Sequence, residues 1–254
     1  MSRLLTEYEV LSWKRDGFLV KESFADAETL ALLRTAYEEA LAATFSGDRM
    51  LGGITRQVMV PSAEHPVFDD NPLVDRARQV VCELYGTADA VRVFDMLIFK
   101  PPGHPHATPW HQDMSYAGTP FAPAGAQPID GLVQFWVPLD DVDDDNGCMQ
   151  FVPGHHTEPL LPHYVAGGEP DDPGRLLAIE EPETHLDLSH KVVAALPAGG
   201  VTMHGYGTPH YTGPNRSTDR PRRAYIVNVA TLEAHEWLLA ASQRSAAASG
   251  CELD

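Results

Sequence analysis

Apolar residues recur every three or four positions over much of the first third of the chain, a spacing that predicts helices with one buried face. The segments that show it are residues 6–15, 26–45 and 72–86. Thr6 is a residue type that caps helix N-termini, and Pro72 suits the first turn of a helix. A short apolar run at residues 18–20 predicts a strand. The first third is therefore expected to be mainly helical.

After Gly86 the pattern changes to short runs rich in β-branched and aromatic residues, separated by Pro, Gly and Asp clusters, which predicts strands. The predicted strands are residues 91–99, 110–113, 132–139, 149–152, 192–195, 201–204 and 223–229. Asn146-Gly147 favours a tight hairpin turn, so the strands on either side of it are expected to be antiparallel neighbours. Many short strands that follow helices favour a mainly β fold with flanking helices and a jelly-roll core.

We expect a single domain over residues 1–254. Its parts would be a helical N-terminal part at about 1–88, a jelly-roll core at about 89–231 and an Ala-rich C-terminal helix at about 232–249. Two long loops, residues 101–109 and 159–182, are candidates to cover a site.

The charge and composition of the chain indicate which partners and which cellular compartment to expect. The chain has 18 Lys and Arg against 36 Asp and Glu, a formal charge of −18, so nucleic acids and anionic membrane surfaces are not expected partners. Its three cysteines have no short spacing, and we find no secretory leader and no apolar run of membrane-spanning length. A cytoplasmic, reducing setting is expected, and the oligomeric state stays open.

The clearest candidate chemistry is the pair His111 and Asp113, because residues two apart in a strand point to the same face. Two ligands do not hold a transition metal, and His210, just before a predicted strand, is the strongest candidate for the third. Two histidines and one carboxylate leave the opposite coordination positions open. That arrangement suits non-haem Fe(II) with a bidentate co-substrate and O₂.

His111, Asp113 and His210 also have interpretations other than iron binding. A His-X-Asp pair often arises by chance, the chain has 12 histidines, and structural or turn-capping roles are common for both residue types. Three ligands and a water would also suit catalytic zinc. The acidic run at residues 140–145 lacks the spaced pattern of a calcium loop and is expected to be a solvated turn.

Five ordered blocks of sequence resemble the phytanoyl-CoA dioxygenase family of iron and 2-oxoglutarate oxygenases. The blocks are residues 100–102 with 110–113, 136–141, 146–149 with 152–154, 210–217 and 222–224. The resemblance implies a double-stranded β-helix (cupin-like) and names His111, Asp113 and His210 as the iron ligands. It also implies that an arginine about a dozen residues beyond His210 binds the far carboxylate of 2-oxoglutarate.

Either Arg222 or Arg223 could be the arginine that binds 2-oxoglutarate, because the loop before them is one residue longer than the common pattern of the family. Neighbours on a strand point to opposite faces, so only one can reach the cavity, and Arg222 is favoured. The resemblance places Thr212 near the same carboxylate, with Thr108, Trp136 and Met149 along the pocket. For each of these, turn formation or core packing is an open alternative.

Several further polar residues occur within the matching blocks. His204, His155 and His156 are expected in packing or surface roles, because this metal arrangement needs no fourth protein ligand. Gln112 and Asn215 are candidates for polar roles, and Asn215 also suits a turn.

The resulting hypothesis is an Fe(II)- and 2-oxoglutarate-dependent dioxygenase that uses O₂ to hydroxylate an unactivated C–H bond of a small organic molecule, with secondary metabolism as its suggested field. Asp113 argues against the halogenating relatives, in which a non-carboxylate residue frees a site for chloride. The alternatives are a zinc hydrolase, for which no general base is evident, and a non-catalytic jelly-roll binding module.

Overall fold

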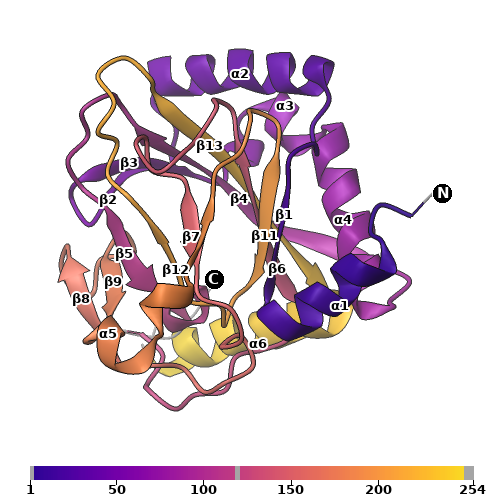
Figure 1. Ribbon diagram of the computed structural model, residues 1–254, viewed down its shortest axis with the longest axis vertical. Coiled ribbons are helices and arrows are strands. Elements are labelled where there is room, and N and C mark those ends of the chain that lie inside the picture. The colour runs from indigo at the N-terminus through magenta and orange to yellow at the C-terminus, as the bar shows by residue number, and fades with distance from the viewer. Residues whose placement is uncertain (1–2, 118–120, 249–254) are drawn as a thin grey trace.

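Two antiparallel sheets face each other at the centre of the computed structural model, which describes residues 3–117 and 121–248 (Figure 1). The larger sheet runs in the order β1 (Phe18–Lys21), β11 (Val201–Gly205), β6 (Leu132–Pro138), β13 (Arg222–Thr231), β4 (Ala90–Lys100), β3 (Thr55–Met59) and β2 (Asp48–Leu51). The smaller sheet runs β10 (Val192–Ala194), β7 (Met149–Phe151), β12 (His210–Thr212) and β5 (Thr108–His111). This is the expected cupin-like jelly roll, with sheets that are open and not closed into a barrel.

The central strand β6 of the larger sheet is buried on both faces, which explains why it is almost continuously apolar. On β6, Phe135 and Val137 pack against the helices, while Trp136 between them packs toward the smaller sheet. Strand β13 repeats this with Tyr225 on the helical side and Ile226 on the inner side. The alternation divides the core into an outer helical layer and an inner layer between the sheets.

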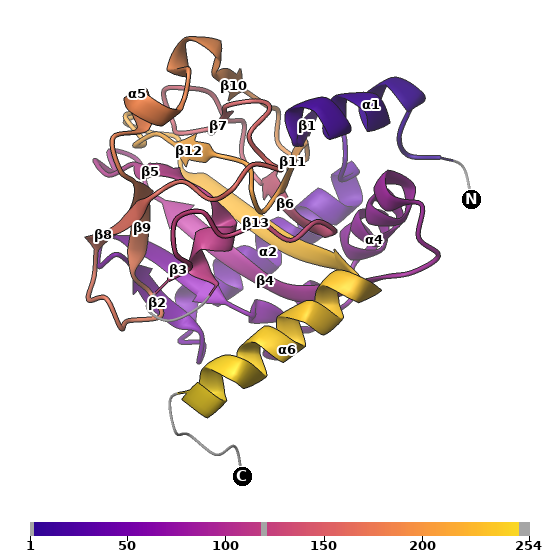
Figure 2. The same cartoon turned by 90° about the horizontal axis from the view of Figure 1, so that it is seen from below.

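The helices predicted in the first third of the chain cover the outer face of the larger sheet. The long ones are α1 (Glu7–Asp16), α2 (Ala27–Ala42) and α4 (Pro72–Tyr85), and α3 (Pro66–Asp69) is a single turn. Thr6 and Glu9 form a reciprocal capping box at the start of α1, as the cap prediction requires. The tail helix is α6 (Leu232–Ala248), which crosses below β13 and β4 (Figure 2). The position expected for its last residue, 249, lies outside the described residues.

Several short strands escaped the sequence analysis. Strand β1 matches the strand predicted at residues 18–20, but β2 and β3, which also extend the larger sheet, were not predicted, so the first third is less purely helical than expected. The expected loop at residues 159–182 contains β8 (His163–Gly167) and β9 (Leu176–Ile179), which pair with each other, and α5 (Pro182–His185) follows. Segments of three to five residues are too short to show a period, so only their pairing defines them.

The predicted hairpin at Asn146-Gly147 is wrong, because β6 and β7 belong to opposite sheets. Asn146 instead forms a side-chain turn, in which its Oδ1 accepts from Asp143 N at 2.8 Å and its Nδ2 donates to Asp141 O at 2.8 Å. Gly147 has the expected positive φ of 87°, but the connection turns a corner between the sheets. The dipeptide therefore indicates the local backbone and not the pairing of its neighbours.

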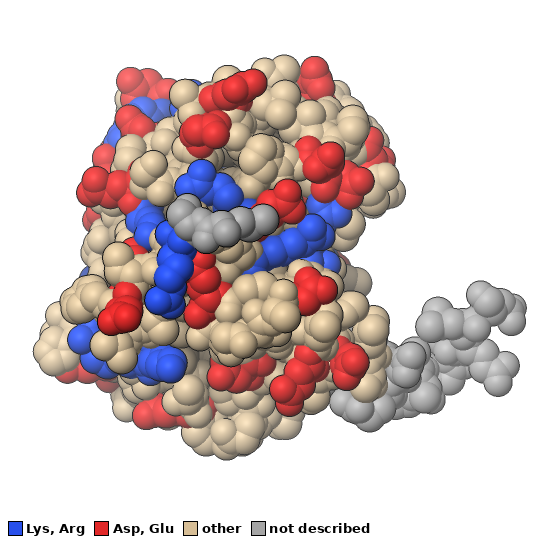
Figure 3. All heavy atoms as spheres, turned by 90° about the vertical axis from the view of Figure 1, so that its right-hand side faces the viewer, with Lys and Arg blue, Asp and Glu red and all other residues tan. Residues whose placement is uncertain are grey.

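Charged groups on the side of α1 and α4 are mixed: Lys and Arg gather across the middle of this face, with Asp and Glu above and below them (Figure 3). At this end of the molecule Lys21 pairs with Glu9 at 2.5 Å and Arg15 with Asp16 at 2.6 Å. Lys21 and Arg15 thus have acidic partners within the chain. None of the helices in residues 3–117 and 121–248 combines the length and apolar character that a bilayer span needs.

Candidate metal centre and co-substrate pocket

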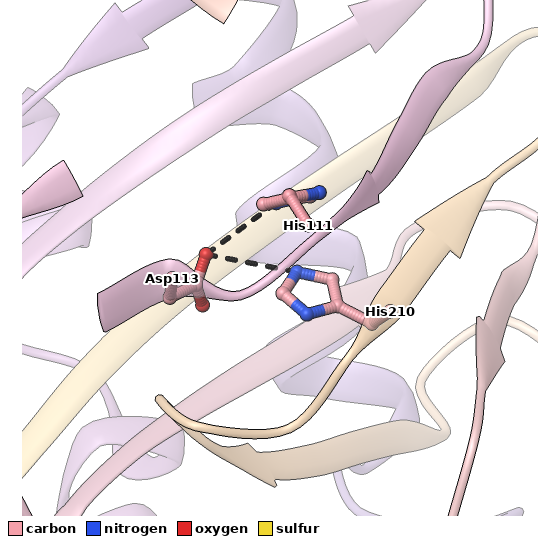
Figure 4. A group of neighbouring side chains, drawn as sticks. All are labelled: His111, Asp113 and His210. Carbon is pink, nitrogen blue, oxygen red and sulfur yellow. Dashed lines mark ion pairs between the residues drawn. The ribbon is translucent and has the colours of Figure 1, made fainter. Parts of the chain in front are cut away.

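The three predicted ligands, His111, Asp113 and His210, meet between the sheets (Figure 4). Strands β5 and β12 pair antiparallel with His210 opposite His111. Strand β5 ends at His111, earlier than predicted, and Asp113 opens the 3₁₀ turn η2 (Asp113–Tyr116). The Nε2 atoms of His111 and His210 lie 3.5 and 3.6 Å from Asp113 Oδ1, so one metal ion could contact all three side chains.

Both imidazoles are oriented by backbone carbonyls two residues earlier in the chain. His111 Nδ1 lies 2.8 Å from Pro109 O, and His210 Nδ1 lies 2.9 Å from Thr208 O. A carbonyl only accepts, so each Nδ1 carries the proton and donates it. The Nε2 atoms are then left to face Asp113, the arrangement that metal-binding histidines commonly show.

Burial and mutual proximity set the charges of this cluster. Burial, together with His111 and His204, holds the pKa of His210 well below its usual range, so this imidazole is neutral. Burial alone would raise the pKa of Asp113, but His210, His111 and His204 outweigh it and keep that pKa well below its ordinary value. A neutral imidazole beside an ionised carboxylate is the protonation state in which these groups bind a divalent metal.

Two buried residues that the sequence analysis did not assign to the site hold the other oxygen of Asp113. Gln134 Nε2 donates to Asp113 Oδ2 at 2.8 Å, and His204 Nε2 lies 3.2 Å from the same oxygen. His204 is fully buried, so its contact with Asp113 goes beyond the expected packing role. A glutamine within the apolar strand β6 was the available signal for Gln134, since buried polar side chains need partners.

A cavity of about 510 Å³ opens from this cluster, and every residue predicted for the site lines it. The predicted lining residues are His111, Asp113, His210, Thr108, Thr212, Trp136, Met149 and Arg222. Thr212 lies opposite Thr108 on β5 and opposite Met149 on β7, so strand pairing brings these positions together. The size matches a pocket for small molecules.

Arg222 enters the cavity and Arg223 does not, as favoured from strand geometry. Arg223 is on the outside, where it pairs with Asp140 and Glu38. Arg222 is 1% exposed and lies 5.7 Å from the Trp136 ring, and burial lowers its pKa to about 10. Its Nε and Nη2 atoms have no hydrogen-bond partner among the described residues. These two atoms form the edge of a guanidinium that binds a carboxylate with two parallel bonds, so the site fits the far carboxylate of 2-oxoglutarate.

Lys100, which the sequence analysis noted only as part of a motif, controls the hydroxyl of Thr212. Its fully buried Nζ donates to Thr212 Oγ1 at 3.0 Å and to Gly213 O at 2.8 Å. Burial and the nearby Arg222 lower the pKa of Lys100 well below its usual range. Because Oγ1 accepts from Lys100, the hydroxyl proton of Thr212 is free to point elsewhere.

The remaining candidates have structural roles in the described contacts. Gln112 donates to Gly207 O at 2.7 Å and accepts from Leu161 N at 2.9 Å, which ties loops together. Asn215 accepts from Ser217 in the turn after β12, as a turn former does. His155 pairs with Glu158 near the surface. Arginines bind the acidic run at residues 140–145: Arg220 contacts Asp143, Arg216 contacts Asp144, and Arg223 contacts Asp140.

Comparison with known proteins agrees with this geometry. The sequence profile of the phytanoyl-CoA dioxygenase (PhyH) family matches residues 13–224. A probable alpha-ketoglutarate-dependent hypophosphite dioxygenase of Stutzerimonas stutzeri is 27% identical over 230 residues, 86% of this chain and 76% of that protein. Phytanoyl-CoA dioxygenase domain-containing protein 1 of Mus musculus is 26% identical over 69% of this chain, which spans 56% of that protein's length.

Solved structures show the same fold. EvdO2 from Micromonospora carbonacea var. aurantiaca, complexed with 2-oxoglutarate, aligns with a TM-score of 0.74 and 27% identity over 91% of this chain and 93% of its own. SnoN, a non-heme alpha ketoglutarate dependent epimerase from nogalamycin biosynthesis, aligns with a TM-score of 0.65 and 25% identity over 88% of this chain and 81% of its own. The chain therefore belongs to the phytanoyl-CoA dioxygenase (PhyH) family of oxygenases, which use Fe(II), 2-oxoglutarate and O₂.

Proposed function

We propose that this chain hydroxylates a C–H bond of a small organic molecule, with His111, Asp113 and His210 as iron ligands and Arg222 as the clamp for 2-oxoglutarate. The observation that carries the proposal is the unpaired Nε and Nη2 edge of Arg222 in the same cavity as the His-Asp-His cluster. A buried cation without a partner is costly, and a bound carboxylate removes that cost. Bound iron would supply the activation of O₂, with 2-oxoglutarate as the co-reductant.

The protein's own part is to position the reactants and to exclude water. Arg222 and the hydroxyl of Thr212 would hold the far carboxylate of the co-substrate. Trp136, Met149 and Ile226 supply apolar walls, which strengthen these polar contacts by keeping water out. Hydroxylation balances as one oxygen atom of O₂ into the product and one into succinate, with loss of carbon dioxide from 2-oxoglutarate.

The structural relatives leave open which reaction follows at the C–H bond, and they suggest that the enzyme acts in secondary metabolism. SnoN is an epimerase from nogalamycin biosynthesis, so a protein of the same fold supports a reaction other than hydroxylation. We place this chain in secondary metabolism on the strength of SnoN and hold hydroxylation as the first choice. Mass spectrometry of product formed under ¹⁸O₂ separates the two outcomes, because hydroxylation adds one labelled oxygen and epimerisation adds none.

Anaerobic addition of Fe(II) and then 2-oxoglutarate tests the metal and co-substrate roles. A weak visible charge-transfer band is expected for the wild type and is not expected for a zinc hydrolase or a non-catalytic jelly roll. Arg222→Gln should weaken the apparent affinity for 2-oxoglutarate about tenfold or more, since it loses two charge-assisted bonds. The neighbouring Arg223→Gln removes only outward ion pairs and is the matched control. A folded, iron-loaded wild type without the band, or equal affinities for 2-oxoglutarate in the two variants, would contradict the proposal.

A further inference from the structure

The far part of the cavity contains a second arginine site that the proposed chemistry does not use. Arg175 precedes β9 and Arg49 is on β2, and both line the cavity that holds the metal cluster. Tyr116 connects them to the centre: its ring centre lies 5.9 Å from the His111 ring centre and 5.9 Å from the guanidinium carbon of Arg175. Arg222, by contrast, lies against Trp136. The two arginine sites are thus separate parts of one cavity.

Arg175 is 8% exposed, yet its Nε atom has no hydrogen-bond partner in the described part of the chain. Its Nη1 donates to the backbone oxygen of Asp172 at 3.3 Å, which leaves the Nε and Nη2 edge available. Elsewhere in this protein the same edge binds a carboxylate: Arg15 holds Asp16 with it and Arg56 holds Asp48. The Nε and Nη2 atoms that bind a carboxylate in Arg15 and Arg56 are therefore available in Arg175, but no carboxylate of the described residues binds them.

Arg49 lies near enough to Arg175 for their charges to interact, and its guanidinium is held in place by two hydrogen bonds. Its Nε donates to Gln57 Oε1 at 2.7 Å, and its Nη1 donates to Pro173 O at 3.0 Å. A backbone bond of 2.6 Å from Gly52 N to Gly174 O holds the two loops together. Burial and the nearby Arg175 lower the pKa of the half-buried Arg49, and the charges of Asp172 and Tyr116 offset this only in part.

Asp171 and Asp172, the acidic residues nearest Arg175 in sequence, form no ion pair with either arginine, although the charge of Asp172 acts on Arg49 from a longer distance. Asp172 Oδ1 accepts from Gly174 N at 2.7 Å and so caps its own turn. Asp171 lines the cavity, but within the described ranges no carboxylate oxygen lies at ion-pair distance from Arg49 or Arg175. In a chain with twice as many acidic as basic residues, two cavity arginines that form no ion pair within the described residues, one of them with an unpaired buried Nε atom, indicate a site for an anionic ligand.

We propose that the substrate carries an oxyanion, a carboxylate or a phosphate ester, which binds the Nε and Nη2 edge of Arg175 with Arg49 beside it. The proposal rests on the proposed function and adds the substrate class to it. An anion held there, across Tyr116 from His111, would present the rest of the molecule to the metal centre. The same fork that fits 2-oxoglutarate at Arg222 would thus recognise the substrate at the other site.

Matched pairs of small molecules test this without knowledge of the substrate. The protein is loaded with Zn(II) and 2-oxoglutarate, so that the Arg222 site is filled and no turnover occurs. The probes are carboxylic acids of about six to twelve carbons with their primary amides, and phosphate monoesters with their parent alcohols, sizes that a cavity of this volume admits. Ligand-observed NMR gives each dissociation constant. The acid and phosphate arms show which oxyanion is preferred.

We expect the best anions to bind about tenfold or more tightly than their neutral partners in the wild type. Arg175→Gln should remove most of that preference, and Arg49→Gln should reduce it. Arg15→Gln, which removes an exposed arginine that uses the same edge far from the cavity, should leave it unchanged. Neutral partners that bind as well as the anions, absence of anion binding, or a preference that survives in Arg175→Gln and Arg49→Gln would overturn the proposal. The charge-transfer band in the iron-loaded wild type reports on the proposed function separately, so the two can fail independently.

Discussion

At the scale of single residues, the candidate metal centre depends on hydrogen bonds that leave one polar atom of each ligand side chain free to face the other ligands. The Nδ1 atoms of His111 and His210 each donate a hydrogen bond to a carbonyl two residues earlier, so Nε2 faces Asp113. Gln134 and His204 occupy Asp113 Oδ2, so Oδ1 faces the two imidazoles. Partners of this kind orient metal ligands before the metal arrives, which lowers the entropic cost of binding it.

Gln134→Leu should weaken the affinity for Zn(II) or Fe(II) about 10–100-fold, because Asp113 loses the amide that orients it. Metal titration of the purified variant measures this. Gln150→Leu is the matched control: Gln150 is also a buried strand glutamine, but it donates to Asp144 at 2.9 Å, away from the cluster. Equal metal affinity in the two variants would show that Gln134 has no positioning role.

At the scale of elements, the site depends on the pairing of short strands in the smaller sheet. Strand β12 lies between β5 and β7 and supplies His210 and Thr212, although it has three residues. Its following turn packs against the β6–β7 corner: a Cβ added at Gly147 would lie 2.6 Å from Gly213 O. The glycine at this corner therefore serves the close approach of two backbones as well as its own positive φ.

Gly147→Ala should destabilise the fold well beyond the cost of its φ, because the new methyl group would displace the backbone after β12. Gly86→Ala is the matched control, since Gly86 also has positive φ but open space around its Cα. We expect about 1–2 kcal/mol for Gly86→Ala and a further 1–3 kcal/mol for Gly147→Ala, the cost of overpacking. Chemical denaturation measures both, and equal losses would refute the close-approach argument.

At the scale of the whole molecule, the two sheets form a rigid holder around a cavity of about 510 Å³. The outer face of the larger sheet carries the helices and most of the apolar core. The inner face carries polar groups such as Arg222 and Lys100. The burial of these groups opposes folding unless a bound ligand offsets the energetic cost. Stability of the whole chain should therefore depend on metal and co-substrate.

Zn(II) at about 100 times its dissociation constant should stabilise the protein by about 2.7 kcal/mol, and 2-oxoglutarate should add a further increment. Thermal unfolding should shift upward by about 2–4 °C for each kcal/mol, and a chelator should reverse the shift. In Arg222→Gln the increment from 2-oxoglutarate should shrink while that from Zn(II) stays. A full 2-oxoglutarate increment in this variant would show that the co-substrate binds elsewhere.

Features that arise from local interactions could be predicted from the amino-acid sequence alone. The helical periods and the Thr6 cap predicted α1, α2 and α4, because turns and caps form between residues close in the chain. Alternation on β13 separated Arg222 from Arg223, since strand neighbours point to opposite faces. Ordered blocks around His111 and His210 indicated the family and hence which distant residues belong together.

Which side chains contact one another across the core depended on the packing of the whole chain. The turn at Asn146-Gly147 was recognisable, but whether it joined one sheet or two depended on packing across the core. Gln134, His204 and Lys100 gained their partners from strands far away in sequence, and Arg49 and Arg175 came together through loop docking. Such contacts depend on the energy of the whole packed arrangement, and no local pattern in the chain encodes them.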